Sequence, residues 1–282
     1  MKKATALLAV LSLTVCSLMG CAQSTATTTQ PAAAETPSTE IIVFAAASMT
    51  ETLEQIVKEY EAANPGIRIT CNLDSSGTLK TQIEEGADCD IFISAAPKQM
   101  DQLDITAGDE KNPDGLDFID HDTRIDILEN KVVLAIPDDN PKNINSYDDL
   151  VKGLKDKSIL MAMGNEDVPV GQYTQKILAF YELDESELAK NGVITYGSNV
   201  KEVTTQIKEA AVDCGIIYST DAYSAGLKSV DTATPEMCGQ VIYPAAVLKG
   251  SKHADEAKAF LDHLTGDESS RIFESVGFTC IK

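Results

Sequence analysis

The 282-residue sequence contains no tryptophan, and aromatic residues make up only 5% of it. Sugar-binding sites usually stack a pyranose ring on an aromatic side chain, so this composition argues against a carbohydrate ligand. Basic residues are also scarce, because 23 Lys and Arg stand against 44 Asp and Glu and give a formal net charge of -21. A surface with this charge repels DNA, RNA and anionic lipid, and the sequence therefore argues against nucleic-acid binding.

The sequence also lacks the usual signatures of enzymes and resident metal ions. A nucleophilic Ser48 or Ser76 would need a base, but the three histidines lie in an acidic stretch or at a surface helix predicted over 254–264. No G-x-S-x-G elbow occurs. The acidic stretch 101–129 has no EF-hand spacing and predicts a solvated loop. We therefore expect no catalytic residue, no bound metal cation and no cofactor.

The cysteines indicate neither a metal site nor a redox centre. The cysteines beyond residue 21 lack any C-x-x-C pair, which disfavours a zinc site or a thioredoxin-like centre. Their odd number leaves buried thiols and one or two disulfides as open alternatives. These cysteines are Cys71, Cys89, Cys214, Cys238 and Cys280.

The first 39 residues predict export and anchoring. Two lysines precede an apolar run, 4–15, that is too short to span a bilayer. The following Leu-Met-Gly-Cys resembles the lipobox of bacterial lipoproteins, which implies removal of 1–20 and lipidation of Cys21; the alternative is an ordinary secretory signal. Residues 21–39 are Ala, Thr, Ser, Gln and Pro with almost no charge, so they predict a flexible tether. The protein is thus expected outside the cytoplasm, anchored to the cell membrane.

From Glu40 onward, short apolar runs alternate with amphipathic helical patterns. Most of the runs are continuous rather than alternating, which suits strands that are buried on both faces. This pattern predicts an α/β fold with parallel-rich sheets and helices on both faces. The runs are 41–47, 67–73, 90–95, 131–137, 158–162, 192–198, 215–219 and 241–248.

Four strand-to-helix turns carry small or hydroxyl residues, at 48–51, 75–78, 168–171 and 198–202. In open parallel sheets such turns lie at the edge where ligands bind. Each helix start offers unpaired N–H groups and about half a positive charge, so four of them would match a dianion without any Lys or Arg. Donors alone suit molybdate, tungstate or sulfate, whereas hydrogen phosphate would need an acceptor. Ser48 and Asn199 also fit ordinary helix N-caps, and that alternative stays open.

Seven short motifs stand out along the chain. They are FAAAS (44–48), SSGTL (75–79), DIFISA (90–95), VPVG (168–171), GIIY (215–218), Tyr243-Pro244 and GFT (277–279). In order and spacing they resemble motifs of molybdate-binding proteins of ABC transporters, and the similarity covers essentially all of 40–282. It implies a two-lobed periplasmic-binding-protein fold of type II with the ligand cleft between lobes, formed by 40–123 with 226–282 and by 124–225.

This resemblance implies a set of ligand donors. Ser48 and Ser76 would contribute hydroxyl and backbone N–H groups, Val170 and Val200 backbone N–H groups, and Tyr218 its phenol. Ala95 would lie beside the site. Molybdenum would then be bound as molybdate, through these residues, and not as a free cation.

The implied function is capture of molybdate, and of tungstate, by an extracytoplasmic solute-binding lipoprotein that delivers the anion to an ABC permease. The protein would be a monomer without catalytic activity. The alternatives are a receptor for another tetrahedral oxyanion, sulfate or phosphate, and an adhesin with a vestigial cleft. Asp74 and Asp221 lie close in sequence to the expected donors, although carboxylates accept hydrogen bonds and repel a dianion. If Asp74 pointed into the site, it would favour a protonated oxyanion such as phosphate. We expect Asp74, Lys80 and Lys201 to face solvent.

Overall fold

The structure is a computed structural model that describes residues 39–281. The predicted signal peptide, Cys21 and nearly all of the predicted tether lie outside the described residues. The described residues belong to one compact unit. Within them, no helix is both long enough and apolar enough to cross a membrane.

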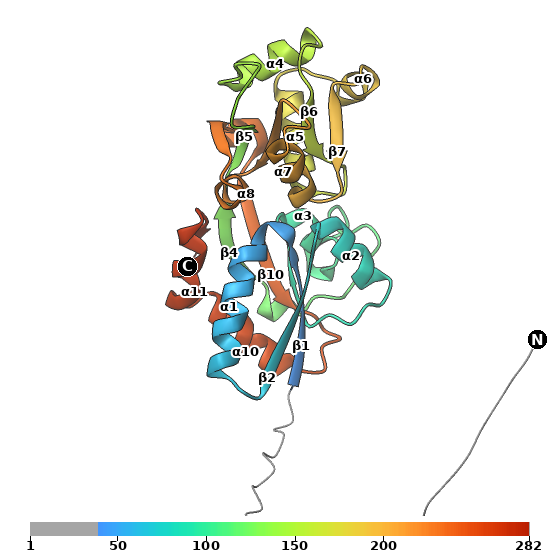
Figure 1. Cartoon of the computed structure of the whole chain (residues 1–282). Helices are drawn as coiled ribbons and strands as arrows, with labels where there is room; N and C mark the ends of the chain where they lie inside the picture. The colour runs from blue at the N-terminus through green and yellow to red at the C-terminus, as the bar shows by residue number, and fades with distance from the viewer. Residues whose placement is uncertain (1–38, 282) are drawn as a thin grey trace, which may run out of the picture. The chain divides into compact units, whose positions relative to one another are not determined.

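The strands of this part of the chain form two sheets, each the centre of one lobe (Figure 1). The first sheet has the order β11-β4-β10-β3-β1-β2. Strand β1 runs parallel to β2 and β3, whereas β10 runs antiparallel to β3 and β4. The strands are β1 (Thr39–Ala46), β2 (Ile67–Asp74), β3 (Ile91–Ile93), β4 (Ile125–Asn130), β10 (Val241–Val247) and β11 (Thr279–Cys280).

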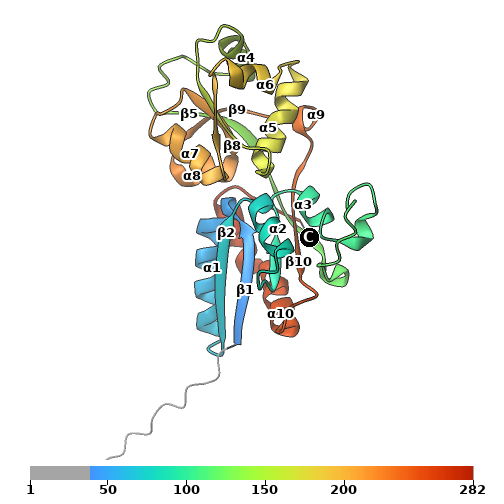
Figure 2. The ribbon, with the colours of Figure 1, turned by 90° about the vertical axis from the view of Figure 1, so that its right-hand side faces the viewer.

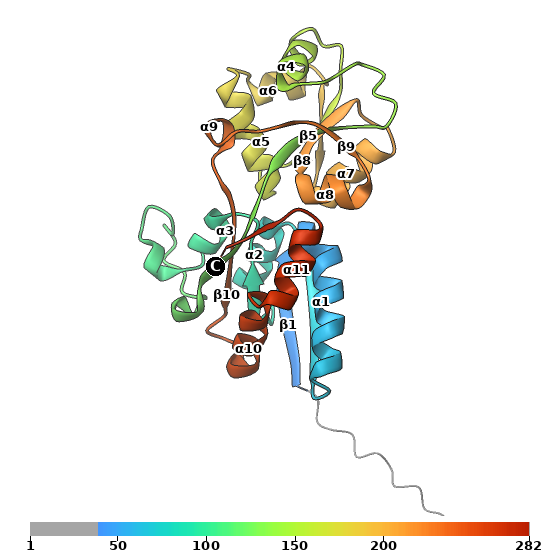
Figure 3. The same ribbon diagram turned by 90° about the vertical axis from the view of Figure 1, so that its left-hand side faces the viewer.

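Helices cover both faces of the first sheet. Leu53 and Ile56 of α1 (Thr50–Ala63) belong to the same apolar core as Phe260 of α10 (Ala254–Leu264) and Phe273 of α11 (Asp267–Ser275). Figure 3 shows α11 beside α1. The opposite face packs on α2 (Ser76–Glu84) and α3 (Pro97–Asp101) through a second core. The short 3-10 helices of this lobe are η1 (Ala47–Met49), η2 (Ile105–Ala107) and η3 (His121–Thr123).

The second sheet has the order β7-β6-β8-β5-β9. Strand β6 is parallel to β7 and β8, and β5 is antiparallel to β8 and β9. Helices α5 and α9 lie on one face and α7 and α8 on the other (Figures 2 and 3). The elements are β5 (Val132–Ile136), α4 (Tyr147–Lys155), β6 (Met161–Gly164), α5 (Pro169–Phe180), α6 (Glu185–Lys190), β7 (Ile194–Gly197), α7 (Val200–Lys208), β8 (Cys214–Tyr218), α8 (Ser219–Ala225), β9 (Lys228–Thr232) and α9 (Pro235–Cys238).

The continuous apolar runs are the buried centres of these sheets. Every residue of β3, β5, β6 and β8 is buried, as expected for strands covered on both faces. The α/β fold class is confirmed. The prediction of parallel-rich sheets is wrong, because four strand pairs are parallel and five are antiparallel.

The chain passes from one sheet to the other at positions different from those predicted. A single residue, Lys131, separates β4 of the first sheet from β5 of the second. The return lies between β9 and β10, through α9. By sheet membership the crossings therefore fall at Lys131 and between Thr232 and Val241, instead of at 123/124 and 225/226. The polar residues Glu129, Asn130 and Lys131 interrupt the apolar pattern of 125–136 at the point where the chain changes sheets.

Candidate functional site

A small cavity lies between the two lobes at the carboxyl ends of β1, β2, β3, β6, β7 and β8, where open α/β sheets bind ligands. The space open to the centre of a water molecule is about 10 Å³, close to what one water requires. The lining consists of residues 46–48, 74–76, 95, 168–170, 200 and 218. It therefore includes all five residues predicted as ligand donors, Ser48, Ser76, Val170, Val200 and Tyr218.

Three helices begin at this cavity. Ser76, Val170 and Val200 lie in the first turns of α2, α5 and α7, where backbone N–H groups have no partner within the helix. Pro169 occupies the first position of α5, where its fixed φ suits the helix and its missing N–H costs nothing. The side chain of Asn199 caps α7 by accepting from the N–H of Glu202 at 3.1 Å. The cavity is thus edged by the positive ends of three helix dipoles.

Ser48 does not cap a helix, so the N-cap alternative is wrong for this residue. Residues 47–49 form η1, and α1 begins at Thr50 with Met49 as an N-cap that makes no side-chain hydrogen bond. The buried Ser48 hydroxyl instead lies 2.8 Å from the hydroxyl of Tyr243. Tyr243 belongs to the Tyr243-Pro244 motif, but the sequence alone predicted no role for its hydroxyl.

The Ser76 hydroxyl has a defined polarity. Its Oγ accepts a hydrogen bond from the backbone N–H of Ala95 at 3.0 Å, and the serine is fully buried. Since a backbone N–H can only donate, the hydroxyl hydrogen of Ser76 remains for another acceptor. Ala95, expected beside the site, both lines the cavity and orients this serine.

Tyr218 presents an unsatisfied polar atom to the cavity. Its side chain is buried, and its hydroxyl has no hydrogen-bond partner among the described residues. Burial raises the pKa of Tyr218 well above its ordinary value, so the phenol keeps its proton. A buried hydroxyl without a partner costs free energy and needs an explanation; a ligand that accepts its hydrogen bond would provide one.

Two contacts across the lobes flank Val200. Asn199 Nδ2 donates to Asp74 Oδ1 at 3.0 Å. Lys201 Nζ donates to both carboxylate oxygens of Glu51 at 2.8 Å. The expectation that Asp74 and Lys201 face solvent is wrong, since each contacts a residue of the other lobe. The partners lie more than a hundred residues away in the sequence, so no local pattern reveals them.

Lys201 also contacts a carboxylate inside the second lobe. Asp221 is fully buried, and its Oδ1 lies 3.1 Å from Lys201 Nζ. Burial raises the pKa of Asp221 to about 6, although Lys201 acts in the opposite direction. Burial alone would lower the pKa of Lys201, but Asp221 and Glu51 raise it. Lys80, also expected in solvent, is only partly exposed and pairs with Glu84 at 2.6 Å.

A close backbone approach between the lobes occurs at Gly77, in the first turn of α2. A Cβ atom at Gly77 would lie 2.1 Å from the carbonyl oxygen of Asp167. No side chain fits at that distance, so the observed approach of the lobes requires glycine. The SSGT motif contained this glycine, but only the fold shows what it faces.

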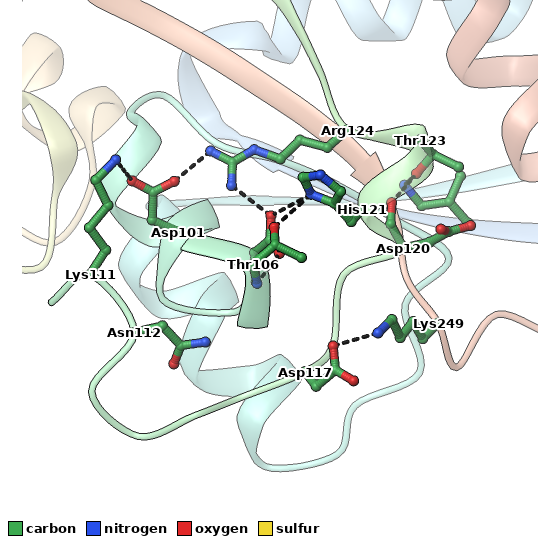
Figure 4. Close-up of polar contacts among 12 residues, drawn as sticks. Asp101, Thr106, Lys111, Asn112, Asp117, Asp120, His121, Thr123, Arg124 and Lys249 are labelled. Atoms are coloured by element: carbon green, nitrogen blue, oxygen red, sulfur yellow. Dashed lines mark hydrogen bonds and ion pairs between the residues drawn. The ribbon is translucent and has the colours of Figure 1, made fainter. Parts of the chain in front are cut away.

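The acidic stretch 101–129 contains an exposed loop, as predicted, over most of 105–117, and ion pairs hold the ends of this loop (Figure 4). Arg124 pairs with Asp101 at 2.5 Å and with Asp104 at 2.8 Å. Asp104 is buried and also accepts hydrogen bonds from Thr106, and Lys111 pairs with Asp101 at 3.1 Å. Within residues 39–281, no group of three or more His, Cys, Asp or Glu side chains could hold a metal ion. Four cysteines, Cys71, Cys89, Cys214 and Cys238, are free thiols.

A family model described as a bacterial extracellular solute-binding protein matches residues 41–279. The chain belongs to this family. Among relatives of this solute-binding protein, the Bacillus subtilis protein YvgL, named as a candidate ABC transporter substrate-binding lipoprotein, is 33% identical over 85% of this chain and 86% of its own length.

Two further comparisons bear on the ligand and on the fold. The molybdate-binding protein ModA of Haemophilus influenzae is 33% identical to this solute-binding protein over 86% of this chain and 91% of its own length. The structure of the Azotobacter vinelandii periplasmic molybdate-binding protein superposes with a TM-score of 0.71 and 19% identity, covering 86% of this chain and 100% of that one. The solute-binding protein thus has the two-lobed periplasmic-binding-protein fold.

Proposed function

We propose that this solute-binding protein captures molybdate, and also tungstate, outside the cytoplasm and delivers it to an ABC permease. The observation that carries the proposal is the cavity, which joins first-turn N–H groups of three helices to the unpartnered, buried hydroxyl of Tyr218. All of these groups donate hydrogen bonds. A tetrahedral oxyanion without protons has only acceptors and would satisfy them.

The charge of the site also suits a dianion. No Lys or Arg lines the cavity, so positive potential comes from the helix starts, at about half a charge each. Fixed dipoles stabilise an anion without the desolvation cost of a buried cation. Such a site holds the anion yet lets it leave when the lobes separate.

The relatives agree with this choice of ligand, because the protein from Haemophilus influenzae that resembles the chain over most of its length is named as molybdate-binding. Tungstate has the same charge and shape as molybdate. Sulfate has shorter bonds than molybdate, so donors placed to reach all the oxygens of molybdate would leave some unpaired around sulfate, and each unpaired donor weakens binding.

Asp74 supports the second candidate, a phosphate receptor. It lines the cavity, and a carboxylate could accept the proton of hydrogen phosphate. However, its Oδ1 already accepts from Asn199 Nδ2 and, at 2.7 Å, from the N–H of Ser75. These two donors compensate the carboxylate, and we therefore place molybdate first.

The remaining parts of the proposal concern the whole receptor. Cys21 carries the lipid anchor, and the chain acts as a monomer that catalyses no reaction. The lobes close on the anion and present a composite surface to the permease, then reopen to release it.

Thermal unfolding of the mature chain with molybdate, tungstate, sulfate or phosphate tests the proposal. Ligand at about 100 times its Kd adds about 2.7 kcal/mol, which shifts the midpoint by roughly 5–10 °C for a chain of this size. A shift with molybdate and tungstate that exceeds the shift with sulfate supports the proposal. A shift with phosphate alone moves the function to the second candidate, and no shift with any anion refutes both.

Substitutions connect the shift to the cavity. Ser76→Ala removes one donor and should weaken molybdate binding about 10-fold or more. Ser224→Ala changes an exposed serine of α8 and serves as the matched control. Equal binding by both variants would place the ligand elsewhere.

A further inference from the structure

The hydroxyl of Ser48 is the end of a buried chain of hydrogen bonds that starts where the polypeptide crosses between the lobes. Ser48 Oγ lies 2.8 Å from Tyr243 OH, and Tyr243 OH lies 3.2 Å from Asn130 Nδ2. Tyr243 is fully buried on β10, and Asn130 is the last residue of β4. Only Ser48 of these three lines the cavity.

The backbone N–H of Lys131 fixes the orientation of the Asn130 side-chain amide, because this N–H can donate a hydrogen bond but cannot accept one. Asn130 Oδ1 accepts from the backbone N–H of Lys131 at 2.8 Å. A backbone N–H only donates, so the atom facing Lys131 must be the oxygen, and the NH₂ group must point the other way. The hydroxyl of Ser219 donates to the same oxygen at 3.0 Å, consistent with this assignment.

This orientation determines where each hydrogen lies along the chain. The NH₂ group of Asn130 has two hydrogens, one for Thr220 Oγ1 at 2.9 Å and one for Tyr243 OH. Tyr243 therefore accepts from Asn130 and directs its own hydrogen to Ser48 Oγ. Burial raises the pKa of Tyr243, so the phenol keeps this hydrogen at neutral pH. Ser48 accepts from Tyr243, and its remaining hydrogen points to the cavity.

We propose that Tyr243 and Asn130 are specificity-determining residues, which fix Ser48 as a donor and so select against an oxyanion that carries a proton on the facing oxygen. The inference rests on the proposed function and refines it. Ser76 is fixed as a donor in the same sense by Ala95, through an independent contact. In each serine one lone pair is occupied by a donor within the protein, so the hydroxyl hydrogen is available to the ligand, and a P–OH group facing that hydrogen would place two hydrogens together.

Sulfate and hydrogen phosphate provide the sharpest comparison, because they have nearly the same size and, in mildly alkaline buffer, the same charge. They differ by one proton. Their binding to the mature chain is measured by competition against molybdate in isothermal titration calorimetry. The ratio of the phosphate Kd to the sulfate Kd isolates the effect of the proton from changes that affect both anions.

Tyr243→Phe keeps the buried ring and removes the hydroxyl, so Ser48 becomes free to accept. We expect the Kd ratio to fall about 10-fold, the effect of relieving one donor-to-donor contact. Asn130→Asp replaces the NH₂ group by an acceptor, which reverses the chain and turns a lone pair of Ser48 to the cavity. The ratio should fall further, although the added charge weakens both anions.

Two controls separate this role from support of the fold. Tyr147→Phe removes an equally buried hydroxyl on α4 that has no partner among residues 39–281, and it should leave the ratio unchanged. In a Ser48→Ala background, Tyr243→Phe should have no further effect on the ratio, because the residue it orients is absent.

An unchanged ratio in both Tyr243→Phe and Asn130→Asp overturns the inference, even if the affinities for sulfate and phosphate fall together. So does a fall in the ratio that persists in the Ser48→Ala background. Failure of the proposed function looks different, because the native chain would then not bind molybdate at all.

Discussion

Among single residues, Asp221 has the clearest consequence for pH dependence. Its folded-state pKa of about 6 lies above the value of about 3.9 in an unfolded chain. The stabilisation that protonated Asp221 gives the folded state is therefore fully present below about pH 4, and it is lost as the pH rises through about 6.

We predict that the free energy of unfolding rises by on the order of 1 kcal/mol between about pH 7 and pH 5. Urea unfolding across this range measures the change. Asp221→Asn has no proton to gain and should give a flat profile. A native profile as flat as that of the variant would show that Asp221 titrates normally.

Arg124 illustrates the opposite case, in which a cation holds buried carboxylates in the charged form. Burial alone would raise the pKa of Asp104, but hydrogen bonds from Thr106 and Arg124 lower it to about 2. This contribution to stability is present above about pH 4 and is lost as the pH falls toward 2.

Arg124→Met should therefore destabilise the protein by about 3–5 kcal/mol at neutral pH, because it removes the Arg partner of the buried Asp104 and leaves Asp101 paired with Lys111 alone. Arg68→Met removes an exposed pair with Glu61 and should cost less than about 1 kcal/mol. Urea unfolding compares the two. Equal losses would mean that the segment 101–129 does not depend on Arg124.

Among the elements, the start of α2 limits how closely the lobes approach. Gly77→Ala improves helix propensity by up to about 1 kcal/mol, so the ligand-free protein should be equally stable or slightly more stable. The added methyl group collides with the carbonyl of Asp167 when the lobes lie as observed. We expect molybdate affinity to fall by about 100-fold or more.

Calorimetric titration and thermal unfolding separate these two effects. Gly66→Ala is the control, since a Cβ at Gly66 meets no atom within 4 Å. Loss of affinity accompanied by loss of stability in the Gly77 variant would point to damage within the first lobe instead.

The start of α7 joins ligand binding to contacts between lobes. Val200 lies between Asn199 and Lys201, whose side chains each reach a carboxylate of the first lobe. Glu51→Gln removes one of these charges and should weaken molybdate binding by about 2–5-fold, as for a partly exposed ion pair.

Salt provides the check, because it screens exposed charges. The decrease in molybdate affinity with added sodium chloride should be smaller in Glu51→Gln than in the native chain. Glu54→Gln, an exposed position on the same helix, should behave like the native chain. If both variants match the native chain, the Lys201 contact does not contribute to closure.

For the molecule as a whole, the sequence predicted what is encoded locally. Continuous apolar runs identified the buried strands, and the four turns beside them contained four of the predicted ligand donors, Ser48, Ser76, Val170 and Val200. These features depend on neighbours in the chain, so they sufficed to predict the fold class and the edge of the sheets at which the candidate site lies. The roles of the individual donors, and Tyr218 altogether, came from the resemblance to molybdate-binding proteins.

Features that depend on distant partners were missed. The roles of Tyr243 and Asn130 arise from contacts over 195 and 113 residues of sequence. Ser48 also fitted an ordinary helix N-cap, and only the structure showed that its hydroxyl contacts Tyr243. The crossing at Lys131 was also missed, because the polar residues before it fit an ordinary strand end as well as a change of sheet.

The arrangement of tyrosines provides an optical consequence. Tyr173, Tyr218 and Tyr243 are packed together, with ring centroids 6.4 Å and 6.0 Å apart for successive pairs, and the first two belong to one lobe while the third belongs to the other. With 8 Tyr and no Trp in the chain, tyrosine emission is not masked by tryptophan. A substantial share of that emission therefore arises beside the cavity and across the two lobes. The native protein should report capture of its anion by its own fluorescence, without an attached dye.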